Sequence, residues 1–176
     1  MPTPIGHALA GIALAGTARR SMSSRRHVAI LAFCASAPDL DLVLRLVDGA
    51  NHHRGPSHSL GAAGLVFVAT LLLRRAGVSL PGAALMAAAW ASHVVLDYLG
   101  RDTSPPFGVM ALWPFSGGFY ISPVSVFYDI PRSFGAAAIR HNLLAVAVEI
   151  AVLAPIAWLS WRSFKPGSGS GPLGRD

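Results

Sequence analysis

The stretch Gly82-Ala-Ala-Leu-Met-Ala-Ala-Ala-Trp-Ala-Ser-His93-Val-Val-Leu-Asp97-Tyr-Leu99 is almost wholly apolar, yet it carries a histidine and an aspartate. About 20 apolar residues of helix cross the hydrocarbon core of a bilayer, so this stretch predicts a membrane helix. His93 and Asp97 stand four residues apart and therefore project from one face of that helix. One metal ion could take a nitrogen and an oxygen from this face. A His–Asp hydrogen bond that holds two helices together is the alternative.

The whole chain has the composition of a membrane protein. Of its 176 residues, 53% are hydrophobic and 12% are charged, and the mean hydropathy is +0.52. Soluble domains carry roughly 25% charged residues, so this chain has too little polar surface to cover a soluble globule. The formal net charge is +6, but the basic residues lie between apolar runs, which argues against a nucleic-acid partner. The single cysteine, Cys34, cannot form an intrachain disulfide, and we expect it to be buried without a role.

Four more apolar runs, at residues 5–18, 27–47, 58–73 and 136–161, accompany the run at 82–99. We expect an all-α fold, an integral membrane bundle of four to five helices, because the run at 58–73 is a little short and the run at 5–18 is marginal. Residues 100–134 are rich in Pro, Gly and aromatics and predict an irregular segment with room for one short helix. Residues 1–164 then form a single transmembrane domain. Residues 165–176 form a flexible tail, part of which could remain from cloning.

Basic residues orient this bundle. Eight of them flank the runs on one side: Arg19, Arg20, Arg25, Arg26, Arg74, Arg75, Arg162 and Lys165. The positive-inside rule assigns that side to the cytoplasm, which predicts a multi-pass membrane protein. The alternation requires the run at 5–18 to cross, with the N-terminus outside. If that run is re-entrant or interfacial instead, the N-terminus lies inside.

Ionisable residues in or beside the apolar runs are the functional candidates, because each costs about 2.5–3.5 kcal/mol to place in a membrane helix. They are His7, Asp39, Asp41, His53, His58, His93 and Asp97. In the expected topology all of them fall near the outer face. Such convergence predicts a metal site, and imidazole with carboxylate suits Zn, Mn or Fe.

Two carboxylates stand close together in Pro38-Asp39-Leu-Asp41. They repel each other when both ionise, and a bound cation is the simplest remedy. One of them would bind a metal, and the other would bind a second metal or act as general base on a bound water. Alternatively, Asp39 only caps a helix that restarts at Pro38.

The loop His53-Arg54-Gly-Pro-Ser57-His58-Ser59 is the most specific segment. Its Gly-Pro turn could fold both imidazoles toward one point, and the Arg54 guanidinium offers a planar fork for phosphate or carboxylate. Ser57 or Ser59 could cap the following helix. A polar loop with incidental histidines is the alternative.

Other charged side chains near the same face have weaker assignments. Arg101 and Arg132 fall on the side of the candidate site and could recognise an anion. We expect three further histidines to stay outside the site: His27, His52 and His141.

These motifs, together with Gly6-His7 and the later Pro-Phe-Gly-Val-x-x-Leu-Trp-Pro at 106–114, occur in the order seen in a known family. The chain resembles the membrane-bound metal-dependent hydrolases, also described as LexA-binding, inner-membrane-associated hydrolases, over roughly residues 5–114. The resemblance implies a multi-pass protein of a bacterial or archaeal inner membrane. That family has been likened to zinc-dependent phospholipase C, an all-helical enzyme with a His-x-x-x-Asp helix. The resemblance implies one set of metal ligands, His7, Asp39, His58, His93 and Asp97. It implies Asp41 and His53 as further ligands or as the acid/base pair.

The sequence thus leads to one main functional hypothesis and one alternative. The main hypothesis is a membrane-embedded hydrolase that binds one or two divalent ions. The expected ion is Zn, with Mn or Fe as alternatives. Asp41 or His53 would move protons, and Arg54 would hold the anionic group of a lipid-borne phosphoester or ester. Membrane lipid and a lipid-like or phosphorylated molecule are then the partners. The alternative is a non-enzymatic transporter or metal-binding module, since intramembrane His and Asp also build ion pathways.

Overall fold

A computed structural model describes residues 1–17, 25–73 and 77–163. Within these ranges the protein is all-α and has no β-strand, as the sequence predicts. In chain order the elements are α1 (Pro4–Thr17), α2 (Arg25–Ser36), the 3-10 turn η1 (Ala37–Leu40), α3 (Asp41–Asp48), the 3-10 turn η2 (Pro56–His58), α4 (Leu60–Leu72), α5 (Leu80–Tyr98) and α6 (Ala136–Ser163).

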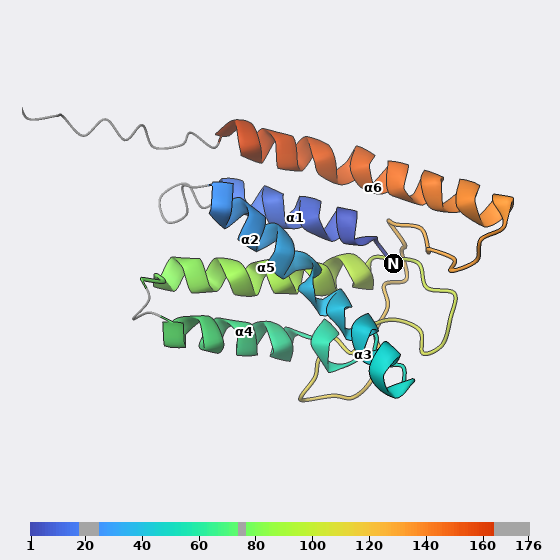
Figure 1. Cartoon of the computed structure of the whole chain (residues 1–176), viewed down its shortest axis with the longest axis horizontal. Helices are drawn as coiled ribbons and strands as arrows, with labels where there is room; N and C mark the ends of the chain where they lie inside the picture. The colour runs from blue at the N-terminus through green and yellow to red at the C-terminus, as the bar shows by residue number, and fades with distance from the viewer. Residues whose placement is uncertain (18–24, 74–76, 164–176) are drawn as a thin grey trace, which may run out of the picture.

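The long helices lie side by side (Figure 1). Helix α1 is central and packs against α2, α5 and α6, while α4 packs against α5 at the far edge. Helices α1, α4 and α6 run in one direction and α2 and α5 run in the other. One end of the bundle therefore gathers the N-terminus, α3 and the segment 100–134, and we call it the loop end.

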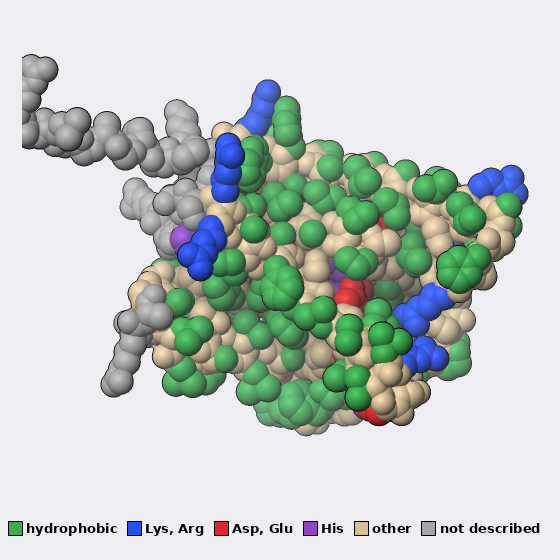
Figure 2. Space-filling view, in the orientation of Figure 1, with side chains coloured by type: hydrophobic (Ala, Val, Ile, Leu, Met, Phe, Trp, Pro, Cys, Tyr) green, Lys and Arg blue, Asp and Glu red, His purple; other side chains and the backbone are tan. Residues whose placement is uncertain are grey.

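Two helices are long and apolar enough to cross a membrane, α5 and the Ala136–Arg162 part of α6. Helices α1 and α4 are also apolar, but with 14 and 13 residues each is about 20 Å long at a rise of about 1.5 Å per residue. The visible face of the bundle is covered mainly by hydrophobic side chains (Figure 2). The structure therefore supports an all-α protein with two candidate spans, fewer than the four to five expected.

The run at 27–47 does not form the single helix that a continuous span would need. Helix α2 ends at Ser36, η1 contains Pro38, and α3 starts at Asp41. Proline has no amide hydrogen to donate and its ring clashes with the preceding turn, so the helix breaks there. The break places Asp39 on a tight turn and Asp41 in the first turn of a new helix.

Close helix packing at the centre depends on small residues. A Cβ atom at Gly11 of α1 would lie 2.5 Å from the carbonyl oxygen of Leu31 in α2. Such close backbone approach is typical of helix pairs in membranes. The buried core around this contact consists of Ala15, Leu31, Ala35 and Ala89 with Val28.

The segment 100–134 forms no helix; it contains turns and two isolated β-bridges, Gly100 with Phe127 and Val109 with Tyr120. At the opposite end of the bundle, α2 begins with Arg25 and Arg26 and α6 ends close to Arg162. Five of the eight basic residues that predicted the orientation lie outside the described residues: Arg19, Arg20, Arg74, Arg75 and Lys165. The tail at 165–176 also lies outside them.

Candidate metal centre

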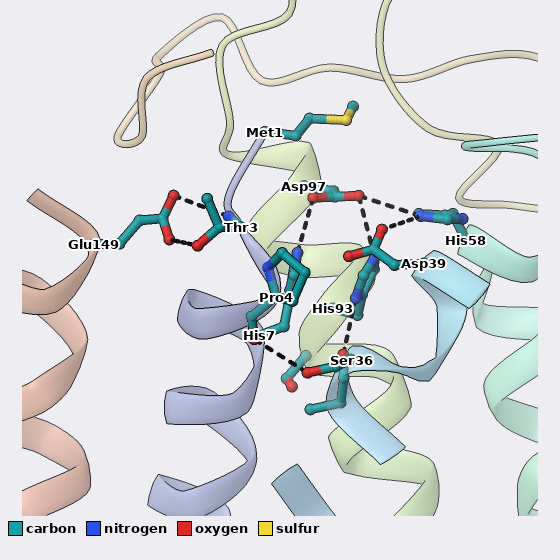
Figure 3. Close-up of polar contacts among 12 residues, drawn as sticks. Met1, Thr3, Pro4, His7, Ser36, Asp39, His58, His93, Asp97 and Glu149 are labelled. Carbon is teal, nitrogen blue, oxygen red and sulfur yellow. Dashed lines mark hydrogen bonds and ion pairs between the residues drawn. The ribbon is translucent and has the colours of Figure 1, made fainter. Parts of the chain in front are cut away.

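Five side chains meet at the loop end of the bundle (Figure 3). Two of them come from α5, and the other three come from α1, η1 and η2. They are His7 of α1, Asp39 of η1, His58 of η2, and His93 and Asp97 of α5. The Nε2 atoms of the three imidazoles lie 3.3 to 3.6 Å from carboxylate oxygens of the two aspartates. The structure thus brings together the five residues that the resemblance implies as metal ligands.

Several donor atoms of this cluster are buried without a hydrogen bond. Within the described part of the chain, these atoms include both ring nitrogens of His7, Nε2 of His58, Nε2 of His93 and Oδ1 of Asp97. The three histidines are fully buried, and the His7 and His93 rings stack at 3.6 Å. A buried polar group without a partner costs about 1–3 kcal/mol. A cation bound among these atoms would take one nitrogen from each imidazole together with Oδ1 of Asp97.

Hydrogen bonds on the far side of two rings orient them. His93 Nδ1 donates to the carbonyl oxygen of Ala35, at 2.8 Å, in the last turn of α2. The last carbonyls of a helix have no partner within it, so the end of α2 at Ser36 makes this acceptor available. With its proton on Nδ1, His93 presents the Nε2 lone pair to the cluster, as metal-binding histidines do.

Asp41 orients His58 in the same way. Asp41 Oδ2 lies 3.1 Å from His58 Nδ1 and accepts a hydrogen bond from Ser57 Oγ at 2.6 Å. Asp41 Oδ1 lies 3.0 Å from His53 Nδ1. Both oxygens are therefore engaged behind His58, and Asp41 supports a ligand instead of facing the cluster. Burial alone would raise the pKa of Asp41, but the hydrogen bonds from His53, His58 and Ser57 outweigh it and lower that pKa.

The carboxylates beside the His58 ring favour its protonated form. Burial would lower the pKa of its ring, but the carboxylates of Asp39 and Asp41 outweigh this effect and raise the pKa to about 9. A metal ion must displace that proton from Nε2.

His53 and Asp39 form the open side of the cluster. Asp39 Oδ1 lies 3.5 Å from His58 Nε2 and 3.9 Å from His53 Nδ1, and these three residues make a second group with metal-binding spacing. The first such group is His7 with His93 and Asp97. Asp39 and His53 keep side-chain exposures of 16% and 13%, whereas the first group is fully enclosed. The cluster is therefore accessible to solvent from the Asp39–His53 side.

A cleft of about 590 Å³ opens on that side. Its lining includes Asp39, Arg45, His53, Arg54, Arg101, Asp102, Asp129 and Arg132. Among the described residues the guanidinium groups of Arg45, Arg101 and Arg132 form no ion pair, and all three side chains are exposed. The cleft therefore presents free positive charge next to the candidate metal centre.

The sequence predicts that the Arg54 guanidinium is available to an anionic group, but in the structure it is paired within the protein. Its backbone φ is 69°, and its buried guanidinium pairs with Asp102 and donates to the carbonyl oxygen of Ser104 at 3.1 Å. This arrangement ties the 53–59 loop to the segment after α5. Contact of Arg54 with an anionic substrate stays a prediction, while Arg101 and Arg132 line the cleft with free side chains.

The loop itself is held in two further places. Ser59 caps α4 by accepting a hydrogen bond from the amide of Ala62, which confirms one of the two predicted caps. Trp90 Nε1 of α5 donates to the carbonyl oxygen of Ser57 at 2.8 Å. The three histidines expected to stay outside the site do so: His52 pairs with Asp48 on the surface, His141 contacts the carbonyl oxygen of Asp129, and His27 is in the first turn of α2.

Sequence reasoning missed Glu149, a fully buried carboxylate in α6 that holds Thr3 at the start of α1. The criterion that selected the other candidates, an ionisable residue in an apolar run, would also have found it. Asp102 and Trp90 carry no comparable signal in the sequence, because their partners lie 48 and 33 residues away.

Comparison with known proteins places the chain in a family. No curated protein and no solved structure matches it. The sequence model of the YdjM inner membrane protein family matches residues 1–169, nearly the whole chain. This match agrees with the apolar composition and with the two candidate spans. The chain therefore belongs to the YdjM inner membrane protein family.

Proposed function

We propose that this inner membrane protein is a metal-dependent hydrolase that acts on a lipid-borne phosphoester or ester. The observation that carries the proposal is the set of buried imidazole nitrogens with no hydrogen bond, which face Asp39 and Asp97 beside a basic cleft. Three imidazoles and two carboxylates are a donor set for Zn, with Mn or Fe as alternatives. One ion would be held by His7, His93 and Asp97, and the Asp39–His53–His58 group could take a second.

A metal ion in this place would polarise a phosphoryl or acyl oxygen and lower the pKa of a bound water. The protein residues then have separate tasks. Because Ala35 and Asp41 engage their Nδ1 atoms, His93 and His58 would direct Nε2 to the ion, His58 after losing its Nε2 proton. With one ion bound, His53, which lines the cleft and hydrogen-bonds Asp41, would act with Asp41 to accept a proton from the attacking water and to return one to the leaving group.

The substrate class follows from the surroundings of the cluster. Free guanidinium groups in the cleft favour an anionic group such as a phosphate, and the apolar exterior keeps the protein in lipid. We propose a multi-pass topology in which α5 and α6 cross the membrane, α1, α2 and α4 pack beside them within it, and the loop end faces outward. Arg25 and Arg26 at the start of α2 and Arg162 in the last turn of α6 lie at the other end of the bundle and favour this orientation.

Elemental analysis of detergent-purified protein is the first test, followed by hydrolysis of phospholipid-like esters. We expect the protein to retain Zn, or Mn or Fe, and to hydrolyse such an ester. His93→Ala and Asp97→Ala should lose both the metal and the activity. His52→Ala is the matched control. It removes an exposed histidine that pairs with Asp48 away from the cluster, and it should keep both the metal and the activity.

The result that overturns the proposal is a protein that binds no metal, or one whose hydrolytic activity survives loss of His93 and Asp97. Metal that is retained without hydrolysis, together with metal-ion flux into proteoliposomes, would instead identify a transporter.

A further inference from the structure

Helix α3 has two unlike faces. Asp41 and Arg45 stand one turn apart, and with Leu42 between them they occupy one side of the helix. Asp41 supports His58 in the metal centre, while Leu42 and Arg45 line the cleft. The eight-residue helix is thus one wall of the candidate site.

The other face of α3 is apolar and exposed. Leu46 and Val47 are 85% and 82% exposed, and Val43 and Leu44 are about half exposed. A soluble protein rarely leaves a patch of this kind uncovered. Since this chain belongs to an inner membrane family, bilayer lipid is available to cover it.

The position of α3 in the bundle indicates how deep this helix lies in the bilayer. It lies at the loop end, beyond the break at Pro38. An amphipathic helix with one apolar face and one charged face lies at the boundary between headgroups and acyl chains. The charged face looks into a cleft with the free guanidinium groups of Arg45, Arg101 and Arg132, and phosphate is the charge complement that this boundary supplies.

We propose that α3 lies in the headgroup boundary of the bilayer and is the wall over which an anionic phospholipid enters the cleft. The acyl chains stay in the bilayer beside Leu46 and Val47, while the headgroup phosphate reaches Arg45, Arg101 and Arg132. This inference rests on the proposed function for its substrate, whereas the depth of α3 can be measured without any hydrolysis.

The depth test uses the full chain in nanodiscs that contain phosphatidylcholine and phosphatidylglycerol. In a Cys34→Ala background, a nitroxide is attached at Leu46→Cys and, as matched control, at Asn51→Cys, an exposed residue of the cleft lining three residues after α3. The relaxation of each nitroxide by oxygen, which concentrates in lipid, is then compared with its relaxation by a water-soluble nickel complex. We expect oxygen to dominate at residue 46 and the nickel complex to dominate at residue 51.

Equal access of the nickel complex to both labels would overturn the proposal, because α3 would then be in water. Dipolar broadening between labels at residue 46 would also overturn it, since a second copy of the chain would then cover this face.

The entry route is tested with two esters, an anionic phospholipid in the nanodisc and the water-soluble p-nitrophenyl phosphate. Leu46→Glu should slow phospholipid hydrolysis by about 10-fold or more, because a charge is costly at this depth, and leave the soluble ester unchanged. Ala50→Glu, which adds the same charge at an exposed position after α3, should change neither rate. Equal slowing of both esters, or of neither, contradicts the route. A wild-type protein that hydrolyses neither ester contradicts the proposed function, and the label depths still decide where α3 lies.

Discussion

The carboxylate of Glu149, in α6, accepts two hydrogen bonds from Thr3, one from its amide at 2.9 Å and one from its hydroxyl at 2.6 Å (Figure 3). Thr3 precedes α1 directly, and its carbonyl accepts the amide of His7. A negative charge at a helix N-terminus is favourable, so this contact holds the first turn of α1 against α6. Glu149 is thereby a positioning residue for His7, although it lies outside the metal cluster.

Replacing Glu149 by Ala should destabilise the protein and weaken its metal site together. Two partly buried donors of Thr3 would lose their acceptor, at about 1–3 kcal/mol, and α1 would hold His7 less firmly. Thermal unfolding in detergent and a zinc titration measure the two effects. Glu149→Gln can still form hydrogen bonds with both groups of Thr3. Its unfolding midpoint and zinc affinity should therefore lie between those of Glu149→Ala and wild type. Wild-type metal affinity in Glu149→Ala would refute the positioning role.

A methyl group at Gly6 should disturb the same contact. Its Cβ would lie 2.8 Å from Glu149 Oε2, so Gly6→Ala should cost about 1–3 kcal/mol of unfolding free energy, as overpacking does. Gly64→Ala in α4 is the matched control, because nothing lies within 4 Å of a Cβ there. That substitution should be neutral or stabilising by up to about 1 kcal/mol, since Ala favours helix over Gly. Equal unfolding midpoints for the two variants would show that the Gly6 contact has no energetic weight.

Asp41→Asn should weaken metal binding without abolishing it. Partners that orient a metal-binding histidine typically contribute 10–100-fold in affinity, so we expect a loss of about that size. His58→Ala removes a ligand atom and should lose more. Competition with a chromophoric chelator measures both dissociation constants. An Asp41→Asn variant as defective as His58→Ala would indicate that Asp41 binds the metal itself.

The metal-free protein should lose stability with rising pH while its metal affinity increases. The folded-state pKa of His58, about 9, lies above the ordinary value of 6.5. The protonated ring therefore contributes stability that is complete below pH 6.5 and is lost as pH rises through about 9. Over the same interval Nε2 becomes available, so zinc binding should release fewer protons and become tighter.

Unfolding midpoints and zinc titrations test this dependence. They should cover roughly pH 6 to 9.5, which includes the ordinary and the folded-state pKa of His58. In His58→Ala the stability decrease assigned to this ring should disappear. If that variant retains the full decrease, another group is responsible for it.

Arg54→Met should act through stability. It would leave the side chain of Asp102, which is 6% exposed, without its ion-pair partner, and breaking a buried pair typically costs about 3–5 kcal/mol. Arg101→Met removes an exposed guanidinium from the same cleft and should leave the unfolding midpoint unchanged. Chemical unfolding of both variants measures the difference. Equal stability would show that Arg54 is free to serve the substrate, as its sequence motif indicates.

The sequence by itself determined the helical class, the membrane setting and the candidate residues. Long apolar runs favour helices wherever lipid is the solvent, because each backbone group must bond within its own segment. An ionisable residue in such a run is costly enough to indicate function, and this criterion selected His7, His93 and Asp97 without any knowledge of their contacts. It also indicated that the candidates share one end of the bundle, because helix direction alternates along the chain.

Only the tertiary structure decided which of these side chains face one another. Asp39 and Asp41 are two residues apart, yet the break at Pro38 sends one toward the cluster and the other behind His58. The sequence alone predicts that Arg54 is available to a substrate, whereas the fold pairs it with Asp102. Contacts between distant segments depend on where helices end and how closely they pack, and small residues such as Gly6 and Gly11 set that packing only once their neighbours are in place. Spacing along the chain carries the local periodicity of a helix, whereas the partner of a buried charge is a property of the assembled bundle.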